Sequence, residues 1–117
     1  MTDTKFYVVT ATDKPGLAEL RQQTRPAHRA YLRGQSLVQI CAAGPLLEEH
    51  SEAMNGTFIL CSADSRDSVE AFVAGDPYAR SGLFAEVSIR RLNWTMGNPL
   101  VSVDEAARST VTEQIIH

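Results

Sequence analysis

Apolar positions along this chain follow two different periods, and the changes between them predict strands alternating with helices. Four segments have the β-branched, aromatic or alternating composition of strands: residues 6–11, 36–43, 57–62 and 84–92. Two segments instead repeat their apolar positions close to the helical period, residues 17–34 and residues 65–75. The predicted order of elements is therefore β-α-β-β-α-β.

This order predicts an α+β protein with a ferredoxin-like fold, a four-stranded antiparallel sheet with both helices on one face. The other face of such a sheet needs cover, and residues 6–9 are apolar toward both faces. A second copy of the chain is the simplest cover, so we expect a homodimer or a higher homo-oligomer. Residues 1–97 are expected to form the domain. Residues 98–117 are expected to be a tail that packs on a partner subunit or stays disordered.

Proline, glycine and helix-capping residues predict where the elements begin and end. Pro26 lies inside the first helical segment and should kink it or split it in two just before His28. Gly44 and Pro45 should end the second strand. Asp64 or Ser65 can cap the second helix, and Pro77 favours a further short turn of helix after it.

Composition narrows the class of protein. The chain has 117 residues, 44% of them hydrophobic and 21% charged, with a net charge of −3, which suits a single globular domain and gives no positive field for nucleic acid. No apolar stretch approaches the roughly 20 residues that span a bilayer, and the start of the chain lacks a signal-peptide pattern, so we expect a cytoplasmic protein without a membrane partner. Cys41 and Cys61 are expected to be buried free thiols. No phosphate loop or metal-ligand spacing is present, and we expect neither a metal nor a cofactor.

His28 and Asp76 are the candidate catalytic residues. His28 lies one helical turn from both Thr24 and Leu32, at the edge of the apolar stripe. It could serve as a general base or acid, or be a core-edge histidine bonded to the backbone. Asp76 follows the inward face of the second helix, where it could orient the imidazole or simply cap the next turn. Together they could form a proton-transfer dyad if the fold brings them together.

Further residues could contact a substrate. Arg21, Arg25 and Arg29 recur every four residues, as a solvated helix face or as a clamp for an anion, and Arg25 is the strongest candidate because it is within a turn of His28. Backbone turns can line a pocket, and hydroxyl groups can reach a substrate or face water. The remaining substrate-binding candidates are therefore Gly44, Pro45, Tyr78 and Ser81.

Several short motifs, taken in order, resemble those of the YCII-related (YciI-like) family. They are residues 6–9, 25–28 (Arg-Pro-Ala-His), 43–45 (Ala-Gly-Pro), 76–78 (Asp-Pro-Tyr) and 81–83 (Ser-Gly-Leu). The resemblance covers residues 5–94 and implies a ferredoxin-like subunit within a dimeric α+β barrel. It also implies a His and Asp active site, which falls here on His28 and Asp76.

The best understood member of that family looks like a dehydrochlorinase that acts on a chlorinated hydroxyquinol without a cofactor. We therefore predict a small cofactor-independent enzyme, a lyase (dehydrochlorinase-like) or an isomerase, acting on a small cyclic or aromatic-ring metabolite. The alternative is a non-catalytic dimeric module that binds a small ligand or serves as an accessory subunit. Hydrogen-bond contact between His28 and Asp76 beside an open pocket would favour the enzyme.

Overall fold

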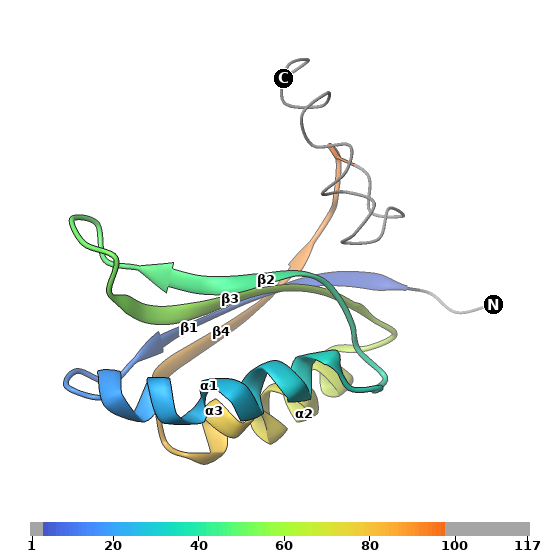
Figure 1. Cartoon of the computed structure of the whole chain (residues 1–117). Coiled ribbons are helices and arrows are strands. Elements are labelled where there is room, and N and C mark those ends of the chain that lie inside the picture. The colour runs from blue at the N-terminus through green and yellow to red at the C-terminus, as the bar shows by residue number, and fades with distance from the viewer. Residues whose placement is uncertain (1–3, 98–117) are drawn as a thin grey trace.

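The computed structural model describes residues 4–97, which form one sheet with helices packed on a single face (Figure 1). The elements in chain order are β1 (Lys5–Asp13), α1 (Ala18–Arg33), β2 (Gln39–Leu47), β3 (Met54–Ala63), α2 (Arg66–Gly75), α3 (Pro77–Arg80) and β4 (Phe84–Leu92). The sheet order is β2-β3-β1-β4, and each neighbouring pair is antiparallel. The predicted ferredoxin-like α+β fold is confirmed. The predicted tail, residues 98–117, lies outside the described residues.

The hydrophobic core lies between the sheet and the helices. Tyr7 and Val9 of β1 pack with Ile59 of β3 and with Val69 and Phe72 of α2. Strand residues alternate between the two faces of a sheet, so the neighbours of these core positions point away from the helices. That second face carries no helix among the described residues (Figure 1).

Helix α1 runs unbroken through Pro26, so the predicted split into two helices was wrong. Proline removes one helical hydrogen bond and leaves the carbonyl four residues earlier, that of Gln22, without its donor. Both Pro26 and Gln22 are exposed, so water can reach that carbonyl. The cost of the missing bond is therefore small, and His28 lies on the same helix as the residues before Pro26.

Strand β2 continues through Gly44 and Pro45, so the prediction that this pair ends the strand was also wrong. Gly44 lies opposite Phe58, and Pro45 lies opposite Thr57. Strand β2 is at the edge of the sheet, where a residue without an N–H group is tolerated because one side of the strand is unpaired. The strand starts at Gln39, three residues later than predicted.

The second helical region matches the prediction closely. Of the two candidate caps for α2, Ser65 is the one whose hydroxyl accepts a hydrogen bond from the N–H of Ser68, at 3.2 Å. Asp76 follows α2 and caps the short helix α3, where Pro77 occupies the first turn. Helix α3 packs against α1, and this contact brings Asp76 to the helix that carries His28.

Candidate active site

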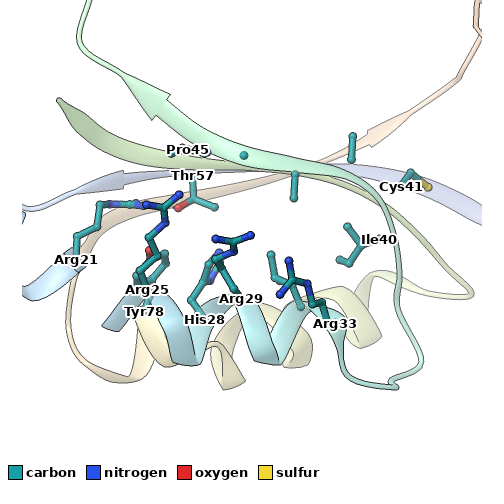
Figure 2. Close-up of a pocket in the computed structure, with 14 residues that line it drawn as sticks. Arg21, Arg25, His28, Arg29, Arg33, Ile40, Cys41, Pro45, Thr57 and Tyr78 are labelled. Carbon is teal, nitrogen blue, oxygen red and sulfur yellow. The ribbon is translucent and has the colours of Figure 1, made fainter. Parts of the chain in front are cut away.

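A pocket of about 740 Å³ lies between α1 and β2 (Figure 2). One wall is made by side chains of α1 that recur at helical spacing, and the facing wall by residues 40–45 of β2. Thr57 of β3 and Tyr78 of α3 also line it. One wall is therefore cationic, and the other is built mainly from aliphatic side chains and backbone.

His28 and Asp76 form a buried hydrogen-bonded pair at this pocket. The Nδ1 atom of His28 lies 2.9 Å and 2.8 Å from the two carboxylate oxygens of Asp76. Only 7% of His28 and 2% of Asp76 is exposed. A carboxylate accepts hydrogen bonds, so Nδ1 carries the proton, and Nε2 on the opposite side of the ring is the free basic atom. Because His28 lines the pocket, the dyad has the arrangement needed for proton transfer there.

Asp76 also caps α3, so both roles considered for it coexist. Its Oδ1 atom accepts a hydrogen bond of 2.9 Å from the N–H of Tyr78. A carboxylate has room for several donors, so the cap does not compete with His28. The cap fixes the carboxylate, and the carboxylate in turn fixes the plane and tautomer of the imidazole.

Tyr78 connects the dyad to the buried ion pair of Arg21 and Asp13. Its ring stacks on the imidazole of His28, and the guanidinium carbon of Arg21 lies 4.5 Å from the centroid of the same ring. Arg21 donates to both carboxylate oxygens of Asp13, at 2.6 Å and 2.9 Å, and to the hydroxyl of Thr57 at 2.8 Å. These contacts join β1, β3, α1 and α3 at the end of the pocket beside the buried Arg21, which we call its inner end.

Burial governs the titration of Tyr78. Desolvation raises the pKa of its phenol, while the nearby cations of Arg21 and Arg25 act in the opposite direction. The phenol is therefore neutral at physiological pH. Tyr78 can pack against His28 without adding a negative charge beside the dyad.

Four of the five substrate-binding candidates line the pocket: Arg25, Gly44, Pro45 and Tyr78. Ser81 does not line the pocket, and its hydroxyl donates instead to the carbonyl of Tyr78, at 2.9 Å, which supports the end of α3. Arg33, the fourth arginine of the same helical stripe, was not among the candidates and also lines the pocket.

Arg21 differs from what its position in the stripe suggested. It is 3% exposed, so it is not part of a solvated helix face. Its partners Asp13 and Thr57 belong to two different strands, 8 and 36 residues away in the sequence, and helical spacing does not reveal them. The available signal was an arginine at helical spacing from His28 together with an aspartate ending the first strand.

Neither cysteine is bonded to the other, and Cys61 is fully buried whereas Cys41 is half-buried. Desolvation raises the pKa of the Cys61 thiol to about 11, so it stays protonated at neutral pH and is a poor nucleophile. Within residues 4–97, no three histidine, cysteine or acidic side chains gather as they would around a metal ion. The helices of this part of the chain are also too short or too polar to cross a membrane.

The ferredoxin-like fold places the chain among small α+β proteins, and sequence comparison assigns it to a family. The YCII-related domain matches residues 5–93. The chain therefore belongs to the YCII-related family, as its motifs indicated.

Relatives of known sequence support this assignment. Protein YciI of Escherichia coli O6:H1 is 29% identical over 91 residues, covering 73% of this chain and 93% of that protein. An uncharacterized protein of Haemophilus influenzae is 30% identical over 91 residues, with the same coverage of both chains.

Solved structures share the fold. The 5-chloro-2-hydroxyhydroquinone dehydrochlorinase TftG from Burkholderia phenoliruptrix, in complex with 2,5-dihydroxybenzoquinone, is 31% identical, with a TM-score of 0.68 over 79% of this chain and 95% of that chain. A putative antibiotic biosynthesis monooxygenase from Bacteroides thetaiotaomicron shares the fold at 12% identity, with a TM-score of 0.53 over 81% of this chain and 92% of that chain.

Proposed function

We propose that this protein is a small enzyme, a lyase or an isomerase, in which His28 moves a proton on a cyclic or aromatic-ring metabolite and Asp76 orients the imidazole. The observation that carries the proposal is the buried contact of His28 Nδ1 with both oxygens of Asp76, at 2.9 Å and 2.8 Å, beside the pocket. A module that only binds a ligand has no need of a histidine held in one tautomer.

The proposed chemistry needs the free Nε2 atom of His28 as a general base. Nε2 accepts a proton from a carbon or hydroxyl group of the ring, and the electron pair left behind forms a new double bond within the ring system. In an elimination, the leaving group departs with its bonding pair, and the proton on His28 is later released to water. In an isomerisation, the same proton returns to another ring atom. Arg25 could stabilise the anion formed between these steps.

The shape and chemistry of the pocket support a ring-shaped substrate. Residues Ile40, Ala42, Ala43 and Pro45 of β2 offer apolar surface to one face of a flat molecule. The similarity to TftG, whose structure holds 2,5-dihydroxybenzoquinone, points the same way. No cofactor enters the proposed steps, since the proton is moved by His28 alone.

The test is a screen of hydroxylated and halogenated ring compounds, including 5-chloro-2-hydroxyhydroquinone, followed by ultraviolet absorbance and halide release. We expect turnover by the wild-type protein. His28→Ala removes the base. Asp76→Asn can place an amide N–H opposite Nδ1, which leaves the proton on Nε2, so it should also abolish turnover while the fold persists.

Circular dichroism of each variant provides the control for folding. If His28→Ala and Asp76→Asn retain turnover in proportion to the amount of folded protein, the dyad is structural and the proposed mechanism is wrong. If ring compounds bind to the wild-type protein and none is converted, the ligand-binding module becomes the better description.

We further propose that the protein acts as a homodimer through the face of the sheet opposite the helices. Cross-strand pairs on that face join Phe6 to Leu92 and Val8 to Leu60. These four side chains are half-buried in the single chain, whereas Tyr7, Val9 and Ile59 on the helix face are fully buried. A second copy would cover this apolar face in the way that the helices cover the first.

A further inference from the structure

We infer that Arg29 and Arg33 form an anion-binding subsite at the outer end of the pocket, so that the substrate carries a carboxylate or phosphate group on its ring. The inference rests on the proposed function, because it names the class of substrate for the same pocket. It starts from the cationic stripe of α1, whose four members are Arg21, Arg25, Arg29 and Arg33.

Three of the four charges of this stripe have no counter-charge among residues 4–97. Arg21 is neutralised by Asp13. For Arg25, Arg29 and Arg33, residues 4–97 offer no carboxylate within 4.0 Å and no hydrogen-bond acceptor. Among the described residues that line the pocket there is no aspartate or glutamate. Three positive charges therefore face a cavity whose opposite wall is apolar (Figure 2).

Such a stripe is unfavourable for the helix itself. Like charges four residues apart repel each other on a helix surface, and Glu19 in the first turn is the sole acidic residue of α1. Arg33 gains some compensation because it lies in the last turn, where the helix dipole favours a cation. Arg29 has no such compensation. A bound anion between the two would relieve the repulsion.

The order of residues along α1 separates two ends of the pocket. Arg21 and Arg25 lie at the inner end, where both act on the pKa of Tyr78. Arg29 and Arg33 follow His28 toward the end of the helix, and their side chains lie over the cavity, opposite Ile40 (Figure 2). Both are exposed, so they line the mouth and can receive an anion directly from solvent.

The helix also sets the distance between this subsite and the base. The midpoint of positions 29 and 33 is three residues beyond position 28, or about 4.5 Å along the axis at the usual rise per residue. This separation fits a substituent attached directly to the ring whose other side meets His28. Guanidinium groups bind carboxylates and phosphates with paired, charge-assisted hydrogen bonds, so either group would suit the subsite.

The test compares matched ligands by isothermal titration calorimetry: hydroquinone, 2,5-dihydroxybenzoate and phenyl phosphate. Wild-type protein should bind at least one of the two anions about tenfold more tightly than hydroquinone, a modest preference because the arginines are exposed. Sodium chloride should weaken anion binding and leave hydroquinone binding unchanged. The two anions distinguish a carboxylate subsite from a phosphate subsite.

The double variant R29Q/R33Q should lose the preference for the anion and keep its affinity for hydroquinone. Arg66→Gln removes the same charge from α2, outside the pocket, and serves as the matched control that should retain the preference. Equal wild-type affinity for all three ligands, a preference that survives in R29Q/R33Q, or no binding of any of them at millimolar concentration would each overturn the inference.

These outcomes are separable from failure of the proposed function. Binding needs no turnover, so a preference for anions that persists in His28→Ala supports the subsite even if the dyad proves to be structural. Conversely, turnover of a ring compound that carries a carboxylate or phosphate, if R29Q/R33Q leaves it unchanged, would support the enzyme and contradict the subsite.

Discussion

The phenol ring of Tyr78 stacks on the imidazole of His28, with ring centroids 4.0 Å apart and planes inclined by 19°. The backbone N–H of Tyr78 also donates to the Asp76 carboxylate that holds His28. The first turn of α3 therefore sets both the hydrogen bond and the plane of the imidazole. This arrangement separates the structural role of Asp76 from its proposed role in catalysis, and substitutions can test the separation.

We expect Asp76→Ala to lower the free energy of unfolding by about 2 kcal/mol, because it removes the cap of α3 and leaves the buried Nδ1–H of His28 without an acceptor. Asp76→Asn should cost roughly half as much, since an amide oxygen can still accept from the N–H of Tyr78. Urea denaturation followed by circular dichroism measures both. Equal losses for the two variants would show that the cap contributes little.

Arg21 should be the arginine of α1 on which stability depends most. Its side chain and that of Asp13 are 4% and 7% exposed, so Arg21→Gln leaves a buried carboxylate without its cation and should cost about 3 kcal/mol. Arg21→Lys should recover only part of that loss. Lysine keeps the positive charge, but its ammonium group cannot make the paired contact with Asp13. Arg29→Gln, on the exposed part of the same stripe, should change stability by less than about 0.5 kcal/mol. A similar loss for Arg21→Gln and Arg29→Gln in denaturant titrations would contradict this ranking.

The sequence predicted the order of the elements well because each one carries a clear period and is bounded by turn residues. Strand β4 and the short helix after Asp76 are examples. It failed where tertiary position overrides a local rule. Pro45 is tolerated because β2 is an edge strand, and Pro26 because its surroundings are exposed. Neither circumstance can be read from the neighbouring residues.

Part of the candidate site could be predicted from the helical spacing of its residues. His28 and Asp76 each showed a helical position that could face inward, and the resemblance to the YCII-related family supplied the pairing. The burial of Arg21 depends on Asp13 and Thr57, which are brought to it by the antiparallel pairing of β1 with β3. Such a contact depends on the whole sheet, and local spacing carries no information about it.

Cys61 should make stability fall at alkaline pH. Burial raises its pKa from 9.0 to about 11, so in the unfolded chain the thiol ionises near pH 9 while in the folded chain it stays protonated. The free energy of unfolding is unaffected by this thiol below pH 9 and should decrease by about 2 kcal/mol as the pH rises to about 11.

Cys61→Ala isolates this effect, because Tyr78, Tyr31 and Cys41 remain and contribute equally to both proteins. Denaturation in the presence of a reducing agent at several pH values between 8 and 11 measures the two slopes. The variant will be less stable throughout, since it leaves a cavity, so the comparison concerns the slope alone. Parallel slopes would mean that the thiol of Cys61 titrates normally in the folded protein.

The sheet face opposite the helices gives the last prediction. Leu60→Lys places a charge at the centre of that face, where it is tolerated in a single chain exposed to water but is costly between two packed sheets. We expect the wild-type protein to be a dimer at micromolar concentration and Leu60→Lys to be a folded monomer. Ala71→Lys adds the same side chain at an exposed position of α2, on the helix side, and should remain dimeric. Analytical ultracentrifugation with circular dichroism decides the matter: a wild-type monomer, or a Leu60→Lys dimer of unchanged affinity, would show that this face is not the interface.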